Sequence, residues 1–430
     1  MKERIENPDL DQLVREINRN APPAAPLAGN GEMPAGAGNP AAPAGIEKPW
    51  GADLDTPTQS EVVEGEPLDR LLAEVVRAGA SDLLLIAGLP PVFRIDGRLV
   101  PTQGESLEGE EIAALFHSHL SARVRRHLEE RGSGDFSLRM APGRDLQTDA
   151  TGPSRGAWRF RVNVHRQRGQ LAAALRALPR EIPSLASLNL PPALAELVKP
   201  SRGLILLCGP TGSGKTSTLA ALVAEINRTR SAHILTIEDP VEYEHRLNKS
   251  IIEHIEVGRD ARSFHEALRA SLRQDPDVIL VGEMRDLETV ATALTAAETG
   301  HLVLSTLHTN DSVQAVHRIV DVFPPAQQAQ IRHQLALSLH AIVTQQLVPR
   351  ADGRGRVPAV EILLATYPVR HHIRNDQLQK LYNEITLGKR QGLISLEESL
   401  ADLARTGVID VDEARMRASH PEEFESRLRG

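Results

Sequence analysis

The 430-residue chain contains a single cysteine, Cys208, and no long hydrophobic run. One cysteine can form neither a disulfide within the chain nor a cysteine-rich zinc site, which excludes a disulfide scaffold and fits a reducing compartment. No uninterrupted apolar stretch approaches the ~18 to 20 residues that a membrane span requires, and the N-terminus lacks an apolar signal core. The sequence therefore predicts a cytoplasmic protein without direct membrane insertion, which reaches a membrane only through partners.

Aromatic residues and excess positive charge are also scarce. The chain has 2 Trp, 3 Tyr and 7 Phe, so few side chains could stack on single-stranded bases. Lys and Arg number 49 against 57 Asp and Glu, and the net charge of −8 argues against a protein that binds phosphate backbones in bulk. We expect no nucleic-acid partner.

The beginning of the chain differs in composition from the rest. Residues 21–45 are mostly Ala, Pro and Gly, with too little large apolar surface to offset the conformational entropy lost on folding. Ahead of them, four apolar residues recur at helical spacing: Leu10, Leu13, Val14 and Ile17. Residues 1–65 are therefore predicted to be a disordered leader. Its segment 9–20 could form a short amphipathic helix, either one that forms only transiently or one that docks a partner.

Residues 66–185 are predicted to form a smaller α+β domain. A helical pattern at 68–78 precedes strand patterns at 81–86 and 91–100, and 141–156 has the Gly, Pro, Asp and Thr content of a surface loop. Strict alternation then places three apolar side chains on the buried face of a strand: Phe160, Val162 and Val164. Four polar side chains are predicted to share its other face: Arg159, Arg161, Asn163 and His165.

A second domain is predicted at 201–365, after a proline-containing hinge at 186–200. Its short apolar runs read as buried parallel strands at 203–208, 233–237, 278–281 and 302–306, with helical stretches between them. This order predicts an α/β sheet of the RecA kind. Residues 366–430 are predicted to be helical, including a helix at 395–405 that begins with Ser395 and Glu398 in capping-box spacing.

The strongest chemical signal is a glycine-rich phosphate-binding loop. The segment from Gly209 to Thr216 satisfies G-x-x-x-x-G-K-[ST] between a predicted buried strand and a predicted helix. In such a loop backbone N–H groups converge on the β-phosphate, Lys215 reaches the β- and γ-phosphate oxygens, and Thr216 offers its hydroxyl to Mg²⁺. The residues predicted to bind nucleotide are Gly209, Pro210, Thr211, Gly212, Ser213, Gly214, Lys215, Thr216 and Ser217.

Carboxylates follow two of the predicted strands. Glu238, with Asp239 and Glu242 close behind it, ends the 233–237 run, and Glu283 follows the 278–281 run. The carboxyl ends of parallel strands are where α/β folds place the acids that serve a nucleotide's metal and the attacking water. For Asp239 and Glu242 the alternative is a polar turn around Pro240, which by itself favours polar neighbours.

Histidines and arginines complete the candidate site. His301 and His308 flank the 302–306 strand and could sense the γ-phosphate or orient water, although a histidine at a strand end is often only structural. A guanidinium can stabilise a transferring phosphoryl group, and it can come from a mobile domain or a neighbouring subunit. Arg159, Arg161 and Arg176 are candidates for that role, with a solvated strand face as the alternative.

Four motifs, in this order, resemble the Walker A, Asp box, Walker B and His box of the type II/IV secretion ATPases. They are GPTGSGKTST at 209–218, IEDPVE at 237–242, GEMRD at 282–286 and AETGHLVLSTLHT at 297–309. The segments GASDLLLIAGLPPVFRIDG at 79–97 and RFRVN at 159–163 look like the PilT branch, the pilus retraction motors. The resemblance extends over roughly 66–415.

This resemblance implies a PAS-like N-terminal domain joined to a RecA-like ATPase domain, assembled as a homo-hexameric ring. Hydrolysis of ATP, with Mg²⁺ as cofactor, would move an inner-membrane platform protein of the pilus machinery, at which the chain is peripheral. By match, Lys215 and Thr216 bind nucleotide and Mg²⁺, while Glu238 and Glu283 divide metal coordination and water activation between them. His301 and His308 take the His-box positions, and Arg161 and Arg176 lie on the arginine-bearing strands.

The presence of only one cysteine also indicates which branch of this family the chain resembles. Secretion and pilus-extension members usually carry a zinc insertion with paired CxxC motifs, which one cysteine cannot provide, so we expect no zinc. The expected function is type IV pilus retraction, which drives twitching motility. A pilus-extension or type II secretion assembly ATPase is the alternative, and a RecA-like nucleic-acid motor is a less favoured one.

Overall fold

The computed structural model of the protein describes residues 67–95, 97–140 and 157–429. The predicted leader and the predicted loop at 141–156 lie outside these residues. Within them, no helix has the length and apolar character needed to cross a membrane.

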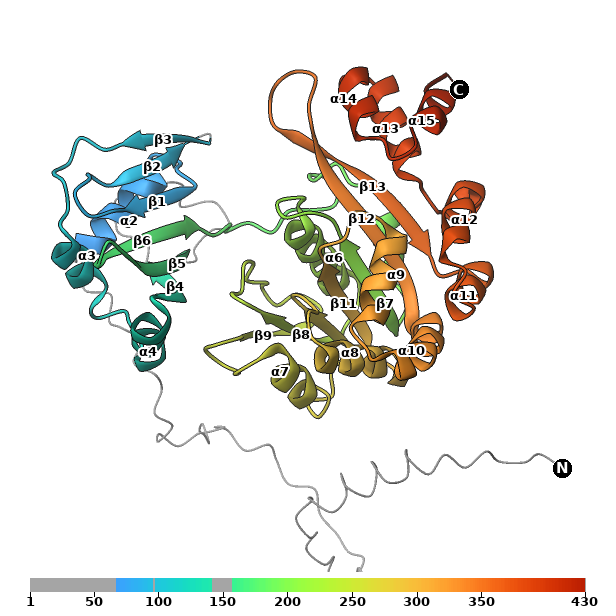
Figure 1. Ribbon diagram of the computed structural model, residues 1–430, viewed down its shortest axis with the longest axis horizontal. Helices are drawn as coiled ribbons and strands as arrows, with labels where there is room; N and C mark the ends of the chain where they lie inside the picture. Colours follow the sequence, from blue (N-terminus) through green and yellow to red (C-terminus); the bar gives the residue numbers. More distant parts are fainter. Residues whose placement is uncertain (1–66, 96, 141–156, 430) are drawn as a thin grey trace, which may run out of the picture. The chain divides into compact units, whose positions relative to one another are not determined.

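The first half of the described chain folds around an antiparallel six-stranded sheet (Figure 1). Its strands are β1 (Asp82–Leu85), β2 (Val92–Ile95), β3 (Arg98–Pro101), β4 (Ser133–Met140), β5 (Trp158–Gln167) and β6 (Gln170–Ala177), in the order β3-β2-β1-β6-β5-β4. Three helices accompany it: α2 (Pro67–Arg77), α3 (Gly109–Phe116) and α4 (Ala122–Arg131). Phe160, Val162 and Val164 are fully buried in its core, as their alternation predicts.

The second half folds around a seven-stranded sheet (Figure 1). Its strands are β7 (Gly203–Cys208), β8 (His233–Glu238), β9 (Ile251–Glu256), β10 (Val278–Val281), β11 (Leu302–Leu307), β12 (Leu339–Pro349) and β13 (Arg356–Leu364). The order is β13-β12-β7-β11-β10-β8-β9, and every pair is parallel except β12 with β13. The predicted α/β fold class is confirmed.

Both faces of this sheet are covered, because its central strands are apolar on both sides. Along β7, Leu204, Leu206 and Cys208 pack into one core with residues of α7, α8, α9 and α10, whereas Ile205 and Leu207 pack into the other with α5 and α6. The helices are α5 (Ala193–Leu197), α6 (Lys215–Thr229), α7 (Phe264–Ser271), α8 (Leu287–Thr299), α9 (Ser312–Asp321) and α10 (Pro325–Ser338). A continuous apolar run is the pattern of such a doubly covered strand.

Short helices close the described chain. They are α11 (Tyr367–Arg374), η2 (Leu378–Lys380), α12 (Leu381–Leu387), η3 (Lys389–Gln391), α13 (Leu396–Arg405), α14 (Val411–Arg417) and α15 (Pro421–Arg429). Ser395 caps α13 as predicted, since its hydroxyl accepts from the Glu398 N–H. The Glu398 carboxylate does not complete the capping box and pairs with Lys389 and Arg427.

Arg159 departs from the predicted solvent face of β5. The residue is only 6% exposed, whereas Arg161, two residues further on, is exposed. The burial comes from outside the strand: Arg159 donates to backbone carbonyls of the segment that follows β8, within the single compact unit that holds all the described residues. Alternation along one strand could not reveal a partner 82 residues away.

Candidate nucleotide-binding site

The phosphate-binding loop connects the end of β7 to the start of α6. Gly214 occupies the N-cap of α6 with φ of 89°, and Lys215 is the first helical residue. The buried Lys215 ammonium donates to the carbonyls of Gly209, at 2.8 Å, and Pro210, at 3.0 Å. Desolvation lowers the pKa of Lys215, and the nearby Glu283 carboxylate opposes that effect. The helix N-terminus and this ammonium together form a site for an anion.

Glycine is required in this loop by the close approach of β12. A Cβ atom at Gly209 would lie 2.2 Å from the carbonyl oxygen of Gln345 and 2.6 Å from the Ser213 hydroxyl, and the φ of 141° disfavours other residues. A Cβ atom at Gly214 would lie 2.8 Å from the Gln345 amide nitrogen. Gln345 also donates to the Ser213 carbonyl and accepts from Thr218. It thus holds the loop from strand β12.

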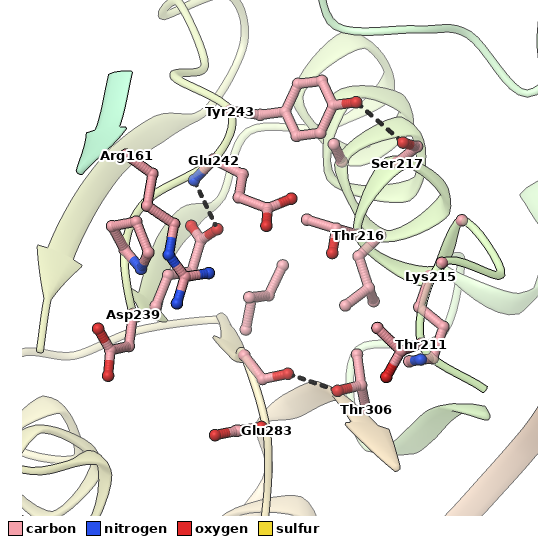
Figure 2. A pocket seen from close by; sticks show the side chains of 18 of the residues that line it. Arg161, Thr211, Lys215, Thr216, Ser217, Asp239, Glu242, Tyr243, Glu283 and Thr306 are labelled. Atoms are coloured by element: carbon pink, nitrogen blue, oxygen red, sulfur yellow. Dashed lines mark hydrogen bonds between the residues drawn. The ribbon is translucent and has the colours of Figure 1, made fainter. Parts of the chain in front are cut away.

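A cavity of about 710 Å³ opens beside the loop. Thirteen of the residues singled out from the sequence line it: Arg161, Arg176, Thr211, Gly212, Gly214, Lys215, Thr216, Ser217, Glu238, Asp239, Glu242, Glu283 and His308. Figure 2 shows Lys215 and Thr211 on one side of this space, Arg161 and Asp239 on the other, and Glu283 between them at its edge. Its lining therefore combines the phosphate loop, the acidic strand ends and four arginines, two of which, Arg161 and Arg176, come from the six-stranded sheet.

The two glutamates come from adjacent parallel strands. Glu238 is the last residue of β8 and Glu283 follows β10 by two residues, and the two strands pair in register. Burial raises the pKa of Glu238 to about 7, while hydrogen bonds from Thr236 and the Glu242 N–H work against that rise. Glu283 is more accessible and pairs with Arg285 at 2.7 Å. The carboxylates therefore sit in different environments, a buried one and a charge-paired one.

The donor set in this cavity fits a magnesium ion. Thr216, Glu238 and Glu283 all present oxygen atoms, which Mg²⁺ prefers, and no thiol competes in the cavity lining. Among the described residues, no three His, Cys, Asp or Glu side chains are placed to hold a metal by themselves. A small set of protein ligands is typical of Mg²⁺ in nucleotide sites, because phosphate oxygens and water complete its coordination there.

The two histidines have different surroundings. His308, beyond the end of β11, lines the cavity with its Nε2 atom 3.9 Å from a Glu283 oxygen, and burial together with Lys215 lowers its pKa. His301 precedes the start of β11, does not line the cavity, and has its Nδ1 atom 3.0 Å from the Ala296 carbonyl oxygen. The two histidines lie at opposite ends of β11, so of the pair only His308 reaches the cavity, and a catalytic role for His301 stays a prediction.

Three predicted loop residues also stay out of the cavity lining: Gly209, Pro210 and Ser213. Gly209 and Pro210 instead give their carbonyls to Lys215, and Ser213 is buried against Gln345. Of the arginines, Arg176 lines the cavity and also pairs with Asp82 at 2.8 Å. Arg159 does not line it, which corrects its candidacy as a group that contacts phosphate.

Sequence reasoning missed two residues that shape this site. The Tyr243 hydroxyl lies 2.9 Å from the Ser217 hydroxyl, next to Thr216 on α6 (Figure 2). Gln345 holds the phosphate loop from β12. Tyr243 lies one residue beyond the Asp box and could have been singled out by that proximity, whereas nothing local in the sequence connects Gln345 to a loop more than 130 residues earlier.

Comparison with known proteins identifies the family. Residues 151–408 match the family described as type II/IV secretion system protein. The chain is 41% identical over 357 residues to the type IV pilus retraction ATPase PilT of Pseudomonas aeruginosa, covering 83% of this chain and 99% of that protein. The chain belongs to the PilT-like type II/IV secretion ATPases. The predicted family is thereby confirmed.

Two further PilT-like relatives extend the likeness. A second P. aeruginosa protein, the type IV pilus ATPase PilU, is 37% identical over 81% of this chain and 88% of its own length. A crystal structure of the pilus retraction motor PilT with bound ADP superimposes with a TM-score of 0.73 at 44% identity, covering 83% of this chain and 98% of that one. As a member of this ATPase family, the chain is a nucleotide-binding P-loop ATPase.

Proposed function

We propose that this PilT-like ATPase is an Mg²⁺-dependent motor that powers type IV pilus retraction as a ring-shaped homo-hexamer. The observation that carries the proposal is the match to PilT over nearly the whole length of that protein. The motor would work in the cytoplasm, peripheral at the inner membrane, and would act on the platform protein of the pilus machinery. The six-stranded and seven-stranded sheets would correspond to the PAS-like and RecA-like domains, at 66–185 and 201–365, with 186–200 as the hinge.

The residues around the cavity would share the work of hydrolysis. The loop amides and Lys215 bind the β- and γ-phosphates and keep the transferring group in line. Thr216, Glu238 and Glu283 would hold Mg²⁺, which when bound neutralises developing phosphate charge. One of the two glutamates accepts a proton from the attacking water, directly or through hydrogen bonds. Arg161 and Arg176 from the six-stranded sheet stabilise charge on the transferring phosphoryl group.

Deletion of the gene and imaging of surface pili tests the direction of force. Loss of a retraction motor leaves excess unretracted fibres and abolishes twitching, and the wild-type gene restores both whereas Lys215→Ala does not. Bald cells would instead assign the chain to pilus extension. A type II secretion assembly role is less favoured, because type II secretion system protein E of P. aeruginosa, at 38% identity, is covered over only 49% of its length.

An accessory role is the second candidate, because the chain also matches PilU, a second type IV pilus ATPase of the bacterium that has PilT. If the chain only assists another retraction ATPase, deletion would leave retraction intact under low load and weaken it under high load. Force measurement on single pili separates the two roles. A sole motor leaves no retraction at any load when deleted.

The ring is tested by mass and by activity. We expect purified protein with nucleotide to have the mass of about six subunits, and the turnover per subunit to rise with protein concentration as rings assemble. A monomer that is fully active at low concentration would contradict the ring.

A further inference from the structure

Arg159 connects strand β5 to the segment that follows β8. Its guanidinium donates to the carbonyl of Val241 at 2.7 Å and to the carbonyl of Glu242 at 2.5 Å, and its Nε atom lies 3.6 Å from Glu244. A planar guanidinium offers parallel N–H groups in a fixed fork, which suits two consecutive carbonyls better than a single ammonium does. The side chain is buried, so these bonds form with little competition from water.

The segment held by Arg159, residues 239–243, belongs to the nucleotide site. The Glu242 N–H donates to the Glu238 carboxylate at 3.4 Å, and the Tyr243 hydroxyl lies 2.9 Å from Ser217. Asp239, Glu242 and Tyr243 all line the cavity. The position of this segment therefore affects both the buried glutamate and the start of α6.

The backbone of Val241 is held through both of its polar groups. Its N–H donates to Glu256 of β9 at 3.3 Å, while its carbonyl accepts from Arg159. The other Glu256 oxygen accepts from Ser137 of β4 at 2.8 Å. Two strands of the six-stranded sheet, β4 and β5, thus reach the backbone of Val241, β4 through Glu256 and β5 directly.

Strand β5 also supplies Arg161 to the cavity, two residues beyond Arg159. Because Arg159 and Arg161 belong to the same hydrogen-bonded strand, a displacement of β5 would move both arginines together. We propose that Arg159 is a positioning residue, which holds the 239–243 segment in its catalytic geometry only while β5 lies against that segment. Turnover then requires the same position of β5 that brings Arg161 to the cavity. The inference rests on the ATPase activity in the proposed function, and does not depend on the direction of pilus movement.

Arg139 offers a matched control for Arg159. It lies directly opposite Arg159 in the register of β4 and β5, and it too pairs with Glu244. Its side chain is 57% exposed, and it is not among the donors to the Val241 and Glu242 carbonyls. Replacing Arg139 therefore removes the same charge from the same place while leaving the carbonyl bonds intact.

The test compares Arg159→Met, Arg159→Lys and Arg139→Met in the full-length chain. For Arg159→Met we expect kcat to fall about tenfold or more while the dissociation constant of a fluorescent ATP analogue changes less than about threefold, because the phosphate loop is held by Lys215 and Gln345. Arg159→Lys should retain an intermediate kcat. Arg139→Met should keep the wild-type kcat.

Hydrogen exchange at 241–244 measures the position of the segment without relying on turnover. Arg159→Met should speed exchange there, and Arg139→Met should not. Unchanged exchange and kcat in Arg159→Met would overturn the proposal. Equal losses of kcat in Arg159→Met and Arg139→Met would overturn it too, and so would a loss of kcat that only parallels a lower melting temperature. If the wild type showed no turnover, the ATPase motor would fail, while exchange would still decide whether Arg159 orders the segment.

Discussion

At the scale of single residues, Lys215 is the group on which phosphate binding most depends. It is the buried ammonium of the loop, and its two carbonyl partners belong to the same loop. We expect Lys215→Ala to lower ATP turnover at least about 10²-fold, because a fixed positive charge beside the transferring group is lost. Lys199→Ala is the control, since Lys199 is an exposed lysine that pairs with Glu196. A Lys215→Ala protein with wild-type turnover would contradict the assignment of the loop.

Gly209 gives a second residue-scale prediction. A methyl group there meets the backbone of β12, which cannot move aside as a flexible side chain could. We expect Gly209→Ala to destabilise the fold by about 1 to 3 kcal/mol through this overlap and to weaken nucleotide binding. Thermal unfolding and nucleotide titration measure both effects. Gly353→Ala is the matched control, because Gly353 also has positive φ but no atom within 4 Å of its Cβ position. Equal destabilisation in both variants would mean that φ alone matters.

At the scale of elements, strand β13 holds the start of helix α9 through a buried carboxylate. Glu361 accepts from both the N–H of Ser312, at 3.0 Å, and its hydroxyl, at 2.6 Å. Burial raises the pKa of Glu361 to about 7, although the Ser312 hydrogen bonds oppose the rise. The folded protein therefore binds this proton more tightly than the unfolded chain between about pH 4.5 and 7.

The sign of the resulting pH dependence follows from linkage. The contribution of Glu361 to stability is full below about pH 4.5 and is lost as the pH rises through about 7, because the buried carboxylate must then ionise. Glu361→Gln removes this titration, so the variant should gain stability relative to wild type between pH 5 and 8, by an amount on the order of 1 kcal/mol or more. Melting temperatures across that range measure the difference. The exposed Glu422→Gln should show no such trend, and a flat difference for Glu361→Gln would refute the expectation.

At the scale of the whole molecule, Arg161 and Lys215 of one chain line the same cavity. Each subunit of a ring would then use its own arginine. Arg161→Ala alone should lower turnover about 10³-fold or more. Rings mixed from Arg161→Ala and Lys215→Ala subunits should show no more turnover than the two variants measured separately. Restored turnover in the mixture would show that the arginine acts across a subunit boundary.

The sequence by itself determined the parts of this protein whose signal is local. Gly203–Cys208 and Val278–Val281 were predicted with the bounds that the structure has, because a parallel strand covered on both faces is a short apolar run that needs no partner to be recognised. The phosphate loop was equally plain, since its glycines and lysine act within eight positions. The four ordered motifs then indicated the family.

Only the tertiary structure decided which distant residues meet. The sequence did not predict β12 and β13. The roles of Gln345 on β12 and Glu361 on β13 were therefore missed as well, because the partners of both residues lie far away in sequence. His301 and Arg159 looked equivalent to His308 and Arg161 along the chain. In the structure, His301 lies at the end of β11 away from the cavity, and Arg159 donates to the backbone carbonyls that follow Pro240. Alternation and motif spacing describe a strand by itself, whereas the direction of a strand in its sheet and the backbone groups opposite it arise only when the chain packs.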